Sequence, residues 1–205
     1  MLGIIDYGSG NIAALTNIFR LHKIPHFVSS KVQELRDARR FLLPGVGAFD
    51  PTMDTLAKSG LVEFLGDQVK GAKKPILGIC VGMQLLAESS DEGNAMGLGF
   101  IAGRVRRIDI RKLNRPPHLP HMGWNSVNIA KDAQLFGGID AKRGFYFLHS
   151  YYFDATNPGE VTATTNYGDE IPCAVQRENV FGAQFHPEKS HSNGVQLLKN
   201  FAGLT

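Results

Sequence analysis

Pro75-Ile76-Leu77-Gly78-Ile79-Cys80-Val81-Gly82-Met83-Gln84 is the stretch that predicts the centre of the fold. An apolar run typical of a buried strand ends at Cys80, glycines flank this cysteine on both sides, and a helix-like pattern follows. Such glycines permit the tight strand-to-helix turn of a nucleophile elbow, which lifts the side chain above the edge of the sheet. The start of the following helix adds positive potential, which favours thiolate over thiol. The stretch therefore predicts a strand that ends in a nucleophilic cysteine.

A second stretch, Gln184-Phe185-His186-Pro187-Glu188-Lys189-Ser190, contains the groups that such a nucleophile needs. A nucleophile needs a base, and the base needs an orienting group. On an extended segment His186 and Glu188 point to the same side, because side chains alternate with period two. Taken singly, Cys80 is equally well explained as a small buried hydrophobic residue, and the His-x-Glu pair as chance. Together with the flanking glycines, the three residues favour a catalytic Cys…His-x-Glu unit.

Outward from these stretches, the first half of the chain alternates between strand and helix patterns. We expect strands at residues 2–6, 26–28, 41–43 and 75–80, and helices at 11–23, 56–69 and 83–89. After residue 99 we expect strands at 100–110, 125–129, 145–153, 161–167 and 173–177, and a last helix at 190–201. Alternating strands and helices imply right-handed crossovers and a parallel sheet. The expected architecture is one domain over residues 1–205, with three α/β/α layers and a mixed, mainly parallel sheet.

Composition restricts the class of protein further. The 205 residues are 43% hydrophobic, which suits one domain with a sizeable core. A net charge of +3, with basic and acidic residues intermixed, does not indicate a nucleic-acid groove. Two cysteines do not make the disulfide framework of a secreted domain, and the first residues lack the features of a signal peptide. Because no apolar run approaches the ~20 residues of a membrane span, we expect a cytoplasmic protein that binds neither nucleic acid nor membrane.

Two cofactor motifs are present only in part. Residues 8–13 (Gly-x-Gly-x-x-Ala) follow a strand and begin a helix, as in a dinucleotide-binding fingerprint. That fingerprint expects an acidic residue near the end of the second strand, where residues 28–31 read Val-Ser-Ser-Lys. The His-x-Glu pair also occurs in zinc deaminases, which need a downstream Pro-Cys-x-x-Cys, whereas Pro172-Cys173 lies upstream without a second cysteine. The scattered remaining histidines lack metal-ligand spacing, so we expect no cofactor and no metal ion.

Four motifs carry a resemblance to a known family. They are residues 7–11 (Tyr-Gly-Ser-Gly-Asn), 44–49 (Pro-Gly-Val-Gly-Ala-Phe), 120–125 (Pro-His-Met-Gly-Trp-Asn) and 181–190 (Phe-Gly-Ala-Gln-Phe-His-Pro-Glu-Lys-Ser). With the cysteine turn, they resemble class I glutamine amidotransferases, in which a cysteine, a histidine and a glutamate release ammonia from glutamine. Within that family they resemble more specifically the glutaminase subunits of imidazole glycerol phosphate synthase. The His-Met-Gly-Trp-Asn run is the most specific of these motifs. The resemblance implies a flavodoxin-like α/β fold.

The resemblance also implies roles for individual residues around the Cys80, His186 and Glu188 triad. The carbonyl oxygen of the substrate needs N–H donors as it gains negative charge. One candidate donor is the N–H of Val81, which follows the nucleophile, and the resemblance assigns the second to the Gly45–Val46 peptide. An ordinary turn is the alternative at that loop. By resemblance, the glutamine itself is bound by the following residues: Gly47, Gln84, Glu92 and the backbone at Ser150 and Tyr151.

The chain ends at Thr205, one helix after the triad, so the chemistry that uses ammonia is expected on a separate polypeptide, unless the protein is a plain glutaminase. A proline-rich run, residues 115–120, leads to the sole tryptophan, Trp124. Composition alone favours a half-buried core position for Trp124, although tryptophan is also enriched among interface anchors. The resemblance instead implies that one face docks onto a (β/α)8-barrel cyclase through the following residues: Asn11, His121, Trp124 and Lys189.

The sequence thus leads to one preferred function and leaves others open. The preferred function is hydrolysis of glutamine to glutamate and ammonia, which the cyclase uses to make imidazole glycerol phosphate and aminoimidazole carboxamide ribotide for histidine and purine metabolism. The first alternative is a stand-alone γ-glutamyl hydrolase or the amidotransferase subunit of another pathway. The second is a non-catalytic binding module, which the intact cysteine, histidine and glutamate argue against.

Overall fold

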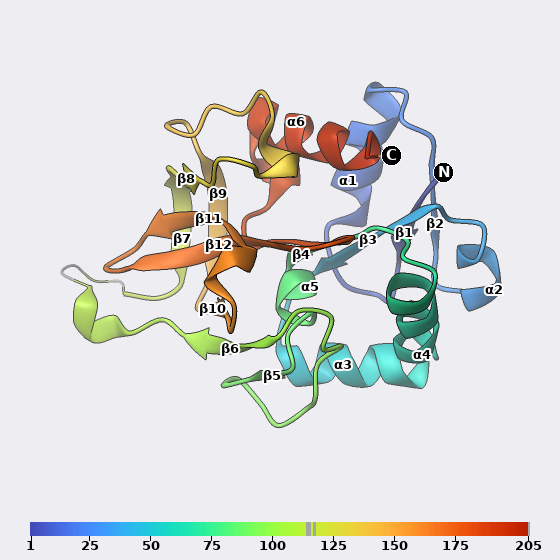
Figure 1. Cartoon of the computed structure of the whole chain (residues 1–205), viewed down its shortest axis with the longest axis horizontal. Coiled ribbons are helices and arrows are strands. Elements are labelled where there is room, and N and C mark those ends of the chain that lie inside the picture. Colours follow the sequence, from blue (N-terminus) through green and yellow to red (C-terminus); the bar gives the residue numbers. More distant parts are fainter. Residues whose placement is uncertain (114–115, 117, 205) are drawn as a thin grey trace.

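The computed structural model describes residues 1–113, 116 and 118–204, and its core is a sheet of eight strands. The strands lie in the order β2-β1-β3-β4-β13-β12-β11-β8 (Figure 1). Their bounds are β1 Leu2–Ile5, β2 His26–Ser29, β3 Arg40–Gly45, β4 Ile76–Cys80, β8 Asn128–Ile129, β11 Val161–Asn166, β12 Glu170–Arg177 and β13 Val180–Ala183. Residues 115 and 117 of the proline-rich run lie outside the described residues.

The first five strands of that order are parallel to their neighbours, and the remaining pairings are antiparallel. The strands β1, β4 and β13 are buried along their whole length, because helices cover both faces, which explains why they are continuous apolar runs rather than alternating ones. The order 2-1-3-4 followed by β13 is the flavodoxin-like, doubly wound arrangement. The expected mixed, mainly parallel sheet is therefore confirmed.

Helices form the two outer layers. Figure 1 shows α1 and α6 on one side of the sheet and α3, α4 and α5 on the other. The bounds are α1 Ile12–Leu21, α2 Val32–Leu35, α3 Phe49–Lys58, α4 Leu61–Leu65, α5 Val81–Gln84 and α6 His191–Ala202, with a π-helical turn, η1, at Gly66–Gly71. Among the described residues, no helix has the length and apolar character needed to cross a membrane.

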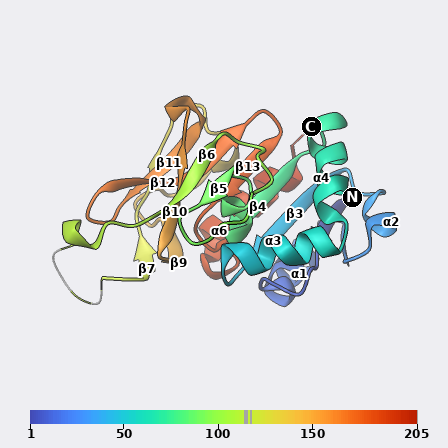
Figure 2. The same cartoon turned by 90° about the horizontal axis from the view of Figure 1, so that it is seen from below.

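Two small sheets flank the antiparallel end of the main sheet. One has the order β10-β6-β5, and the other pairs β7 with β9 (Figure 2). Their strands are β5 Ser89–Ser90, β6 Gly103–Arg107, β7 His121–Asn125, β9 Phe145–His149 and β10 Tyr151–Ala155. The short 3-10 turns are η2 Ile110–Lys112, η3 Gln134–Phe136, η4 Pro158–Glu160 and η5 Pro187–Lys189. The mainly strand character expected after residue 99 is found in these sheets and in β11–β13.

Several element boundaries expected from the sequence were wrong. The helix expected at 56–69 is instead three segments, because Gly60 adopts a left-handed conformation (φ 71°) between α3 and α4 and a π-turn follows α4. The helix expected at 83–89 starts at Val81 and ends at Gln84. The strand expected at 145–153 is two strands in different sheets, separated by a bend at Ser150. The sequence reading also lacked β13, a strand of only four residues between turns.

Candidate active site

Cys80 is the last residue of β4 and adopts a backbone conformation that is rare for a residue with a side chain (φ 54°, ψ −112°). The turn is held by the flanking glycines, which leave no room for a Cβ atom. A Cβ on Gly82 would lie 1.9 Å from the Leu43 carbonyl oxygen, and one on Gly78 would lie 2.4 Å from the Gly82 carbonyl oxygen. Backbone strain of this kind persists where surrounding structure imposes it, which is common at functional sites.

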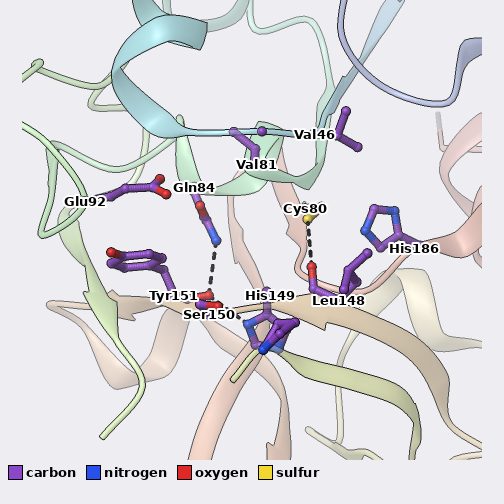
Figure 3. Close-up of a pocket in the computed structure, with 12 residues that line it drawn as sticks. Val46, Cys80, Val81, Gln84, Glu92, Leu148, His149, Ser150, Tyr151 and His186 are labelled. Atoms are coloured by element: carbon purple, nitrogen blue, oxygen red, sulfur yellow. Dashed lines mark hydrogen bonds between the residues drawn. The ribbon is translucent and has the colours of Figure 1, made fainter. Parts of the chain in front are cut away.

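The helix behind the cysteine is shorter than the sequence indicated. The helix α5 has four residues, Val81–Gln84, so the row of aligned peptide dipoles behind Cys80 is a single turn. The Cys80 sulfur lies 3.9 Å from the Leu148 carbonyl oxygen and 3.7 Å from the Gln184 Nε2 atom. The thiol is 4% exposed, and it opens into a pocket rather than into bulk solvent (Figure 3).

His186 and Glu188 form a buried pair next to this turn. The His186 Nδ1 atom and the Glu188 Oε1 atom are 2.9 Å apart, and their side chains are 4% and 2% exposed. The extended geometry proposed from the sequence was wrong, because residues 187–189 form the 3-10 turn η5. The turn, rather than the period of a strand, brings the two side chains together. It is fixed by Ser190, whose hydroxyl donates to the His186 carbonyl oxygen at 2.6 Å.

The strand β13 places this pair beside the cysteine. It is parallel to β4, with Ala183 opposite Ile79, so the residues that follow both strands meet at the carboxyl edge of the sheet. Burial would lower the pKa of His186, but hydrogen bonding and charge interaction with Cys80 and Glu188 outweigh it and raise the pKa to about 9. The imidazole next to the sulfur is therefore held in its protonated form near neutral pH.

A pocket of about 260 Å³ lies in front of the cysteine (Figure 3). This volume is below the ~300–1,000 Å³ of pockets for drug-sized ligands, so the pocket suits a small molecule such as one amino acid. Its wall contains Cys80 and His186 together with the following residues: Val46, Gly47, Val81, Gln84, Glu92, Pro120, Leu148, His149, Ser150 and Tyr151. The structure thus brings to one cavity all the residues to which the resemblance assigned glutamine contacts.

Two of the polar side chains in this wall are held by the protein itself. The Gln84 amide donates through Nε2 to the Tyr151 carbonyl oxygen and to Gln184 Oε1, each at 3.1 Å, and the side chain is buried. Glu92 accepts a hydrogen bond at 2.9 Å from the backbone N–H of Phe49 at the start of α3. Gln84 is thus not a solvated helix residue, and Glu92 is fixed at the rim of the pocket.

The Val46 N–H of the proposed oxyanion loop is bonded within the protein in this structure, although Val46 and Gly47 line the pocket. The Val46 N–H donates to the Ser9 hydroxyl at 3.0 Å, and the same hydroxyl donates to the Val46 carbonyl oxygen at 2.6 Å. Behind the loop, the Tyr7 hydroxyl donates to the Pro44 carbonyl oxygen at 2.5 Å. Because the Val46 N–H already has a partner, it does not point at a substrate oxygen here. No sequence pattern indicated the role of Ser9.

Four side chains form a surface patch beside the triad, which we call the Trp124 patch: Trp124, Tyr146, Lys189 and His191. Trp124 is 43% exposed and its ring stacks on His191 with centroids 5.4 Å apart. Trp124 also lies opposite Tyr146 across the β7–β9 pair, and the Lys189 ammonium lies 5.4 Å from the Tyr146 ring centroid. Tyr146 and His191 were missed by sequence reasoning, because neither lies next to Trp124 in the chain.

The other two residues of the expected docking face have different surroundings. Asn11 is the N-cap of α1, where its side chain accepts from the Ala14 N–H at 3.4 Å. His121 is only 3% exposed and its ring stacks between Phe147 and Tyr167. The ring of His121 therefore faces the interior from β7 rather than the surface.

The protein has an α/β fold, and a thiol, an imidazole and a carboxylate meet at the carboxyl edge of its parallel sheet. These features are typical of the class of enzymes that use a cysteine nucleophile. The chain belongs to the glutamine amidotransferase class-I family, whose family model matches residues 4–203. The members of this family are enzymes, and the sequence-based resemblance to it is confirmed. Among the described residues no group of three or more metal-ligating side chains is present.

Relatives over the full length are known. The chain is 50% identical over 205 residues to the imidazole glycerol phosphate synthase subunit HisH of Bdellovibrio bacteriovorus, and 46% identical over 204 residues to that of Leptospira borgpetersenii. Each alignment covers 100% of both chains. A solved glutamine amidotransferase has a TM-score of 0.74 at 19% identity, with 99% of each chain covered. Another, from Thermotoga maritima, has a TM-score of 0.62 at 19% identity, covering 98% of this chain and 79% of its own. These two structures show the fold.

Proposed function

We propose that the chain is the glutaminase subunit of an imidazole glycerol phosphate synthase. In this proposal it hydrolyses glutamine and passes the ammonia to a (β/α)8-barrel cyclase, which makes imidazole glycerol phosphate and aminoimidazole carboxamide ribotide for histidine biosynthesis. The observation that carries the proposal is the strained Cys80 beside His186 in one amino-acid-sized pocket, with Glu188 buried behind the imidazole. The full-length relatives support the choice of pathway. Two free cysteines fit a cytoplasmic location.

In the first half of the reaction the Cys80 sulfur, as a thiolate whose proton has passed to His186, attacks the side-chain amide carbon of glutamine. The carbonyl oxygen gains negative charge, and the Val81 N–H, at the turn behind the sulfur, is one donor to it. His186 then gives its proton to the amide nitrogen, and ammonia leaves as the tetrahedral intermediate collapses to a γ-glutamyl thioester. The raised pKa of His186 keeps this proton available near neutral pH.

In the second half water attacks the thioester and His186 takes a proton from it. The thiolate leaves, glutamate is released, and the sum is glutamine plus water giving glutamate plus ammonia. Glu188 does not transfer protons in this scheme. It holds the imidazole through Nδ1 and stabilises the imidazolium, which is the role of the third member of such a triad.

The loop at Gly45–Val46 suggests how hydrolysis is coupled to the partner. With its N–H bonded to Ser9, the second oxyanion donor is missing, and losing one such donor costs roughly 10²–10³ in turnover. Gly47 (φ 106°) next to this peptide permits a reorientation at low steric cost. A partner or its ligand that favours the inward orientation would therefore activate the enzyme.

The test is the rate of glutamate release by this chain alone, with a barrel cyclase, and with cyclase plus its ribonucleotide ligand. We expect a low rate for the chain alone and the highest rate for the liganded complex. Cys80→Ala is the control, since it should remove hydrolysis while added ammonium still supports the cyclase reaction. Equal rates in the three conditions would instead indicate a stand-alone γ-glutamyl hydrolase, and hydrolysis by Cys80→Ala at the wild-type rate would exclude Cys80 as the nucleophile.

A further inference from the structure

Two buried histidines outside the triad form a hydrogen-bonded chain that ends at the pocket. The His149 Nδ1 atom lies 2.8 Å from the Tyr151 carbonyl oxygen, and its Nε2 atom lies 2.9 Å from His121 Nδ1. The His121 Nε2 atom in turn lies 3.2 Å from Asn125 Nδ2. His149 and His121 are 6% and 3% exposed. Neither ring takes part in the proposed mechanism, so this buried chain of hydrogen bonds needs an explanation of its own.

The partners leave only one arrangement of protons along this chain. Burial lowers the pKa of His121 to about 4, and burial together with the neighbouring His121 lowers that of His149 to about 3, so both rings are neutral near pH 7. A neutral imidazole has one donor and one acceptor. Because the Tyr151 carbonyl only accepts, His149 carries its proton on Nδ1 and accepts on Nε2. His121 then donates from Nδ1 and accepts on Nε2 from the Asn125 amide.

The chain of hydrogen bonds ends at a bend in the pocket wall. At the bend at Ser150 the backbone leaves β9, which pairs with β7, and enters β10, which pairs with β6. The His149 ring spans this bend by bonding the carbonyl two residues ahead. Gln84 donates to the same Tyr151 oxygen from the opposite wall, so both acceptor positions of that carbonyl are filled (Figure 3). The bend is thus braced on two sides.

We propose that His149 is a positioning residue for glutamine binding, with His121 holding its ring in the donating tautomer. The inference rests on the proposed function, because the backbone at Ser150 and Tyr151 is there assigned to the substrate. A brace on this bend keeps the Ser150 and Tyr151 backbone groups at fixed positions along the pocket wall. Its loss leaves the sulfur, the imidazole and the carboxylate in place but widens the range of positions that the substrate contacts adopt. We therefore expect loss of the brace to raise KM for glutamine and to leave kcat nearly unchanged.

Two substitutions at position 149 each keep one of the two hydrogen-bonding functions of the histidine, either the Nδ1 donor or the Nε2 acceptor. The amide nitrogen of Asn occupies about the position of Nδ1, so His149→Asn keeps the donor to Tyr151 and loses the contact with His121. The longer Gln places its oxygen near the position of Nε2, so His149→Gln keeps the acceptor for His121 and loses the brace. Each variant therefore loses one buried hydrogen bond, and a purely structural role predicts similar behaviour for both.

The measurement is steady-state glutamine hydrolysis in the complex with cyclase and its ribonucleotide ligand, together with a thermal melt of each variant. We expect His149→Gln to raise KM for glutamine roughly fivefold, the factor for one lost hydrogen bond, with kcat nearly unchanged. His149→Asn should keep KM within roughly twofold of the wild type. If His149→Gln does not fold, His149→Phe replaces it, since a ring of similar size without a donor should give the same rise.

The outcomes separate the two proposals. If the wild-type complex hydrolyses glutamine but the donor-retaining and donor-lacking variants have the same KM, the positioning role is wrong and the proposed function stands. A fall in kcat of both variants with unchanged KM would also overturn the positioning role. If the wild-type complex releases no glutamate, the proposed function fails, and the inference that rests on it fails with it.

Discussion

At the scale of single residues, the site depends on how His186 is held between the Glu188 carboxylate and the Cys80 sulfur. Glu188 bonds its Nδ1 atom, and the cysteine sulfur lies on its other side, so the protonated ring is stabilised although it is buried. The Glu188 Oε2 atom has no hydrogen-bond partner among the described residues. The carboxylate is thus committed to the imidazole alone. We therefore expect Glu188 to support His186 and to have little effect on hydrolysis when His186 is absent.

The triad prediction follows from this dependence. His186→Asn should lower glutamine hydrolysis close to background, and Glu188→Gln should lower it less, since the carboxylate only supports the base. Effects within such a unit are non-additive, so the double variant should be scarcely worse than His186→Asn alone. The measurement is kcat/KM of all three variants in the presence of the cyclase. Two large losses that multiply in the double variant would contradict a shared unit.

A second prediction at this scale concerns Ser9, whose hydroxyl bonds both the N–H and the carbonyl oxygen of Val46. Removing the hydroxyl in Ser9→Ala leaves the Val46 N–H without its partner and lowers the cost of turning it toward the substrate. Glutamate release by the chain alone should rise about tenfold, within the roughly 10²–10³ that one oxyanion donor is worth. Ser59→Ala is the matched control, because that hydroxyl bonds the Leu56 carbonyl oxygen in α3. An unchanged basal rate in Ser9→Ala would exclude Ser9 as a restraint on the loop.

At the scale of elements, the junction of β4 and α5 shows why a short sequence motif can fix a tertiary arrangement. The strand β3 lies beside β4, with Gly45 opposite Cys80, so its last residues press directly on the turn. A Cβ at Gly45 would lie 2.6 Å from the Gly82 backbone nitrogen. The glycines in the two motifs therefore fit against each other across neighbouring strands.

This contact gives a stability prediction. Gly82→Ala forces a Cβ atom toward the Leu43 carbonyl oxygen, 1.9 Å away, and should lower the free energy of unfolding by about 3 kcal/mol or more. Gly66→Ala is the control, because nothing lies within 4 Å of its Cβ position in a helical segment. That substitution should be neutral or stabilise by about 0.5 kcal/mol. Denaturant unfolding of both variants is the measurement, and equal stabilities would contradict the steric argument.

The histidines between β7, β9 and β10 predict how stability depends on pH. His121 and His149 have pKa values of about 4 and 3 in the folded chain, against about 6.5 for a free histidine. Between about pH 6.5 and 4 the unfolded chain therefore binds more protons than the folded one, so the free energy of unfolding falls as the pH falls. The slope should approach about 1.4 kcal/mol per pH unit for each histidine. Chemical denaturation from pH 7 to 4 measures it.

His149→Gln is the matched comparison for that titration. It removes one of the two depressed groups while keeping an acceptor for His121, so its acid slope should be about half that of the wild type. A wild-type slope in this variant would show that other groups cause the loss of stability in acid.

At the scale of the whole molecule, the His186–Glu188 pair and the Trp124 patch share one short segment of chain. The turn η5 holds Glu188 against His186, and its next residue, Lys189, faces outward over Tyr146. The backbone N–H of His186 donates to the Tyr146 carbonyl oxygen at 2.9 Å, which joins the turn to β9. A protein that binds the patch would therefore contact the same segment of chain that carries His186 and Glu188.

The corresponding prediction is that Trp124→Ala weakens binding of the cyclase more than it affects the isolated fold. An aromatic anchor at an interface typically costs about 2 kcal/mol or more when it is truncated. In the isolated chain Trp124 is 43% exposed, so its removal should change the melting temperature little. Val28→Ala, an exposed apolar residue on the edge strand β2, is the control and should not alter binding. A large fall in melting temperature with unchanged affinity would argue against an interface role.

The parts of the fold that could be predicted are those with a local physical signature. Continuous apolar runs marked the buried parallel strands β1, β3 and β4, because burial on both faces removes polar positions. The short β13 is an apolar run as well, but four residues between turns are too few to distinguish a strand from a loop. The family was predicted from motifs, and the members of the triad are close together in the structure. Their catalytic roles remain predictions.

The sequence by itself determined the strained turn at Cys80, because only glycines at 78 and 82 fit there, and it determined the layered parallel sheet through its apolar periodicity. Tertiary structure alone decided three other properties. It placed His186 beside Cys80, since this depends on β13 pairing with β4 across about a hundred residues of chain. It turned His121 inward and joined it to His149, and it bonded Val46 to Ser9. These contacts depend on distances between separate elements, and no local pattern of side chains encodes such distances.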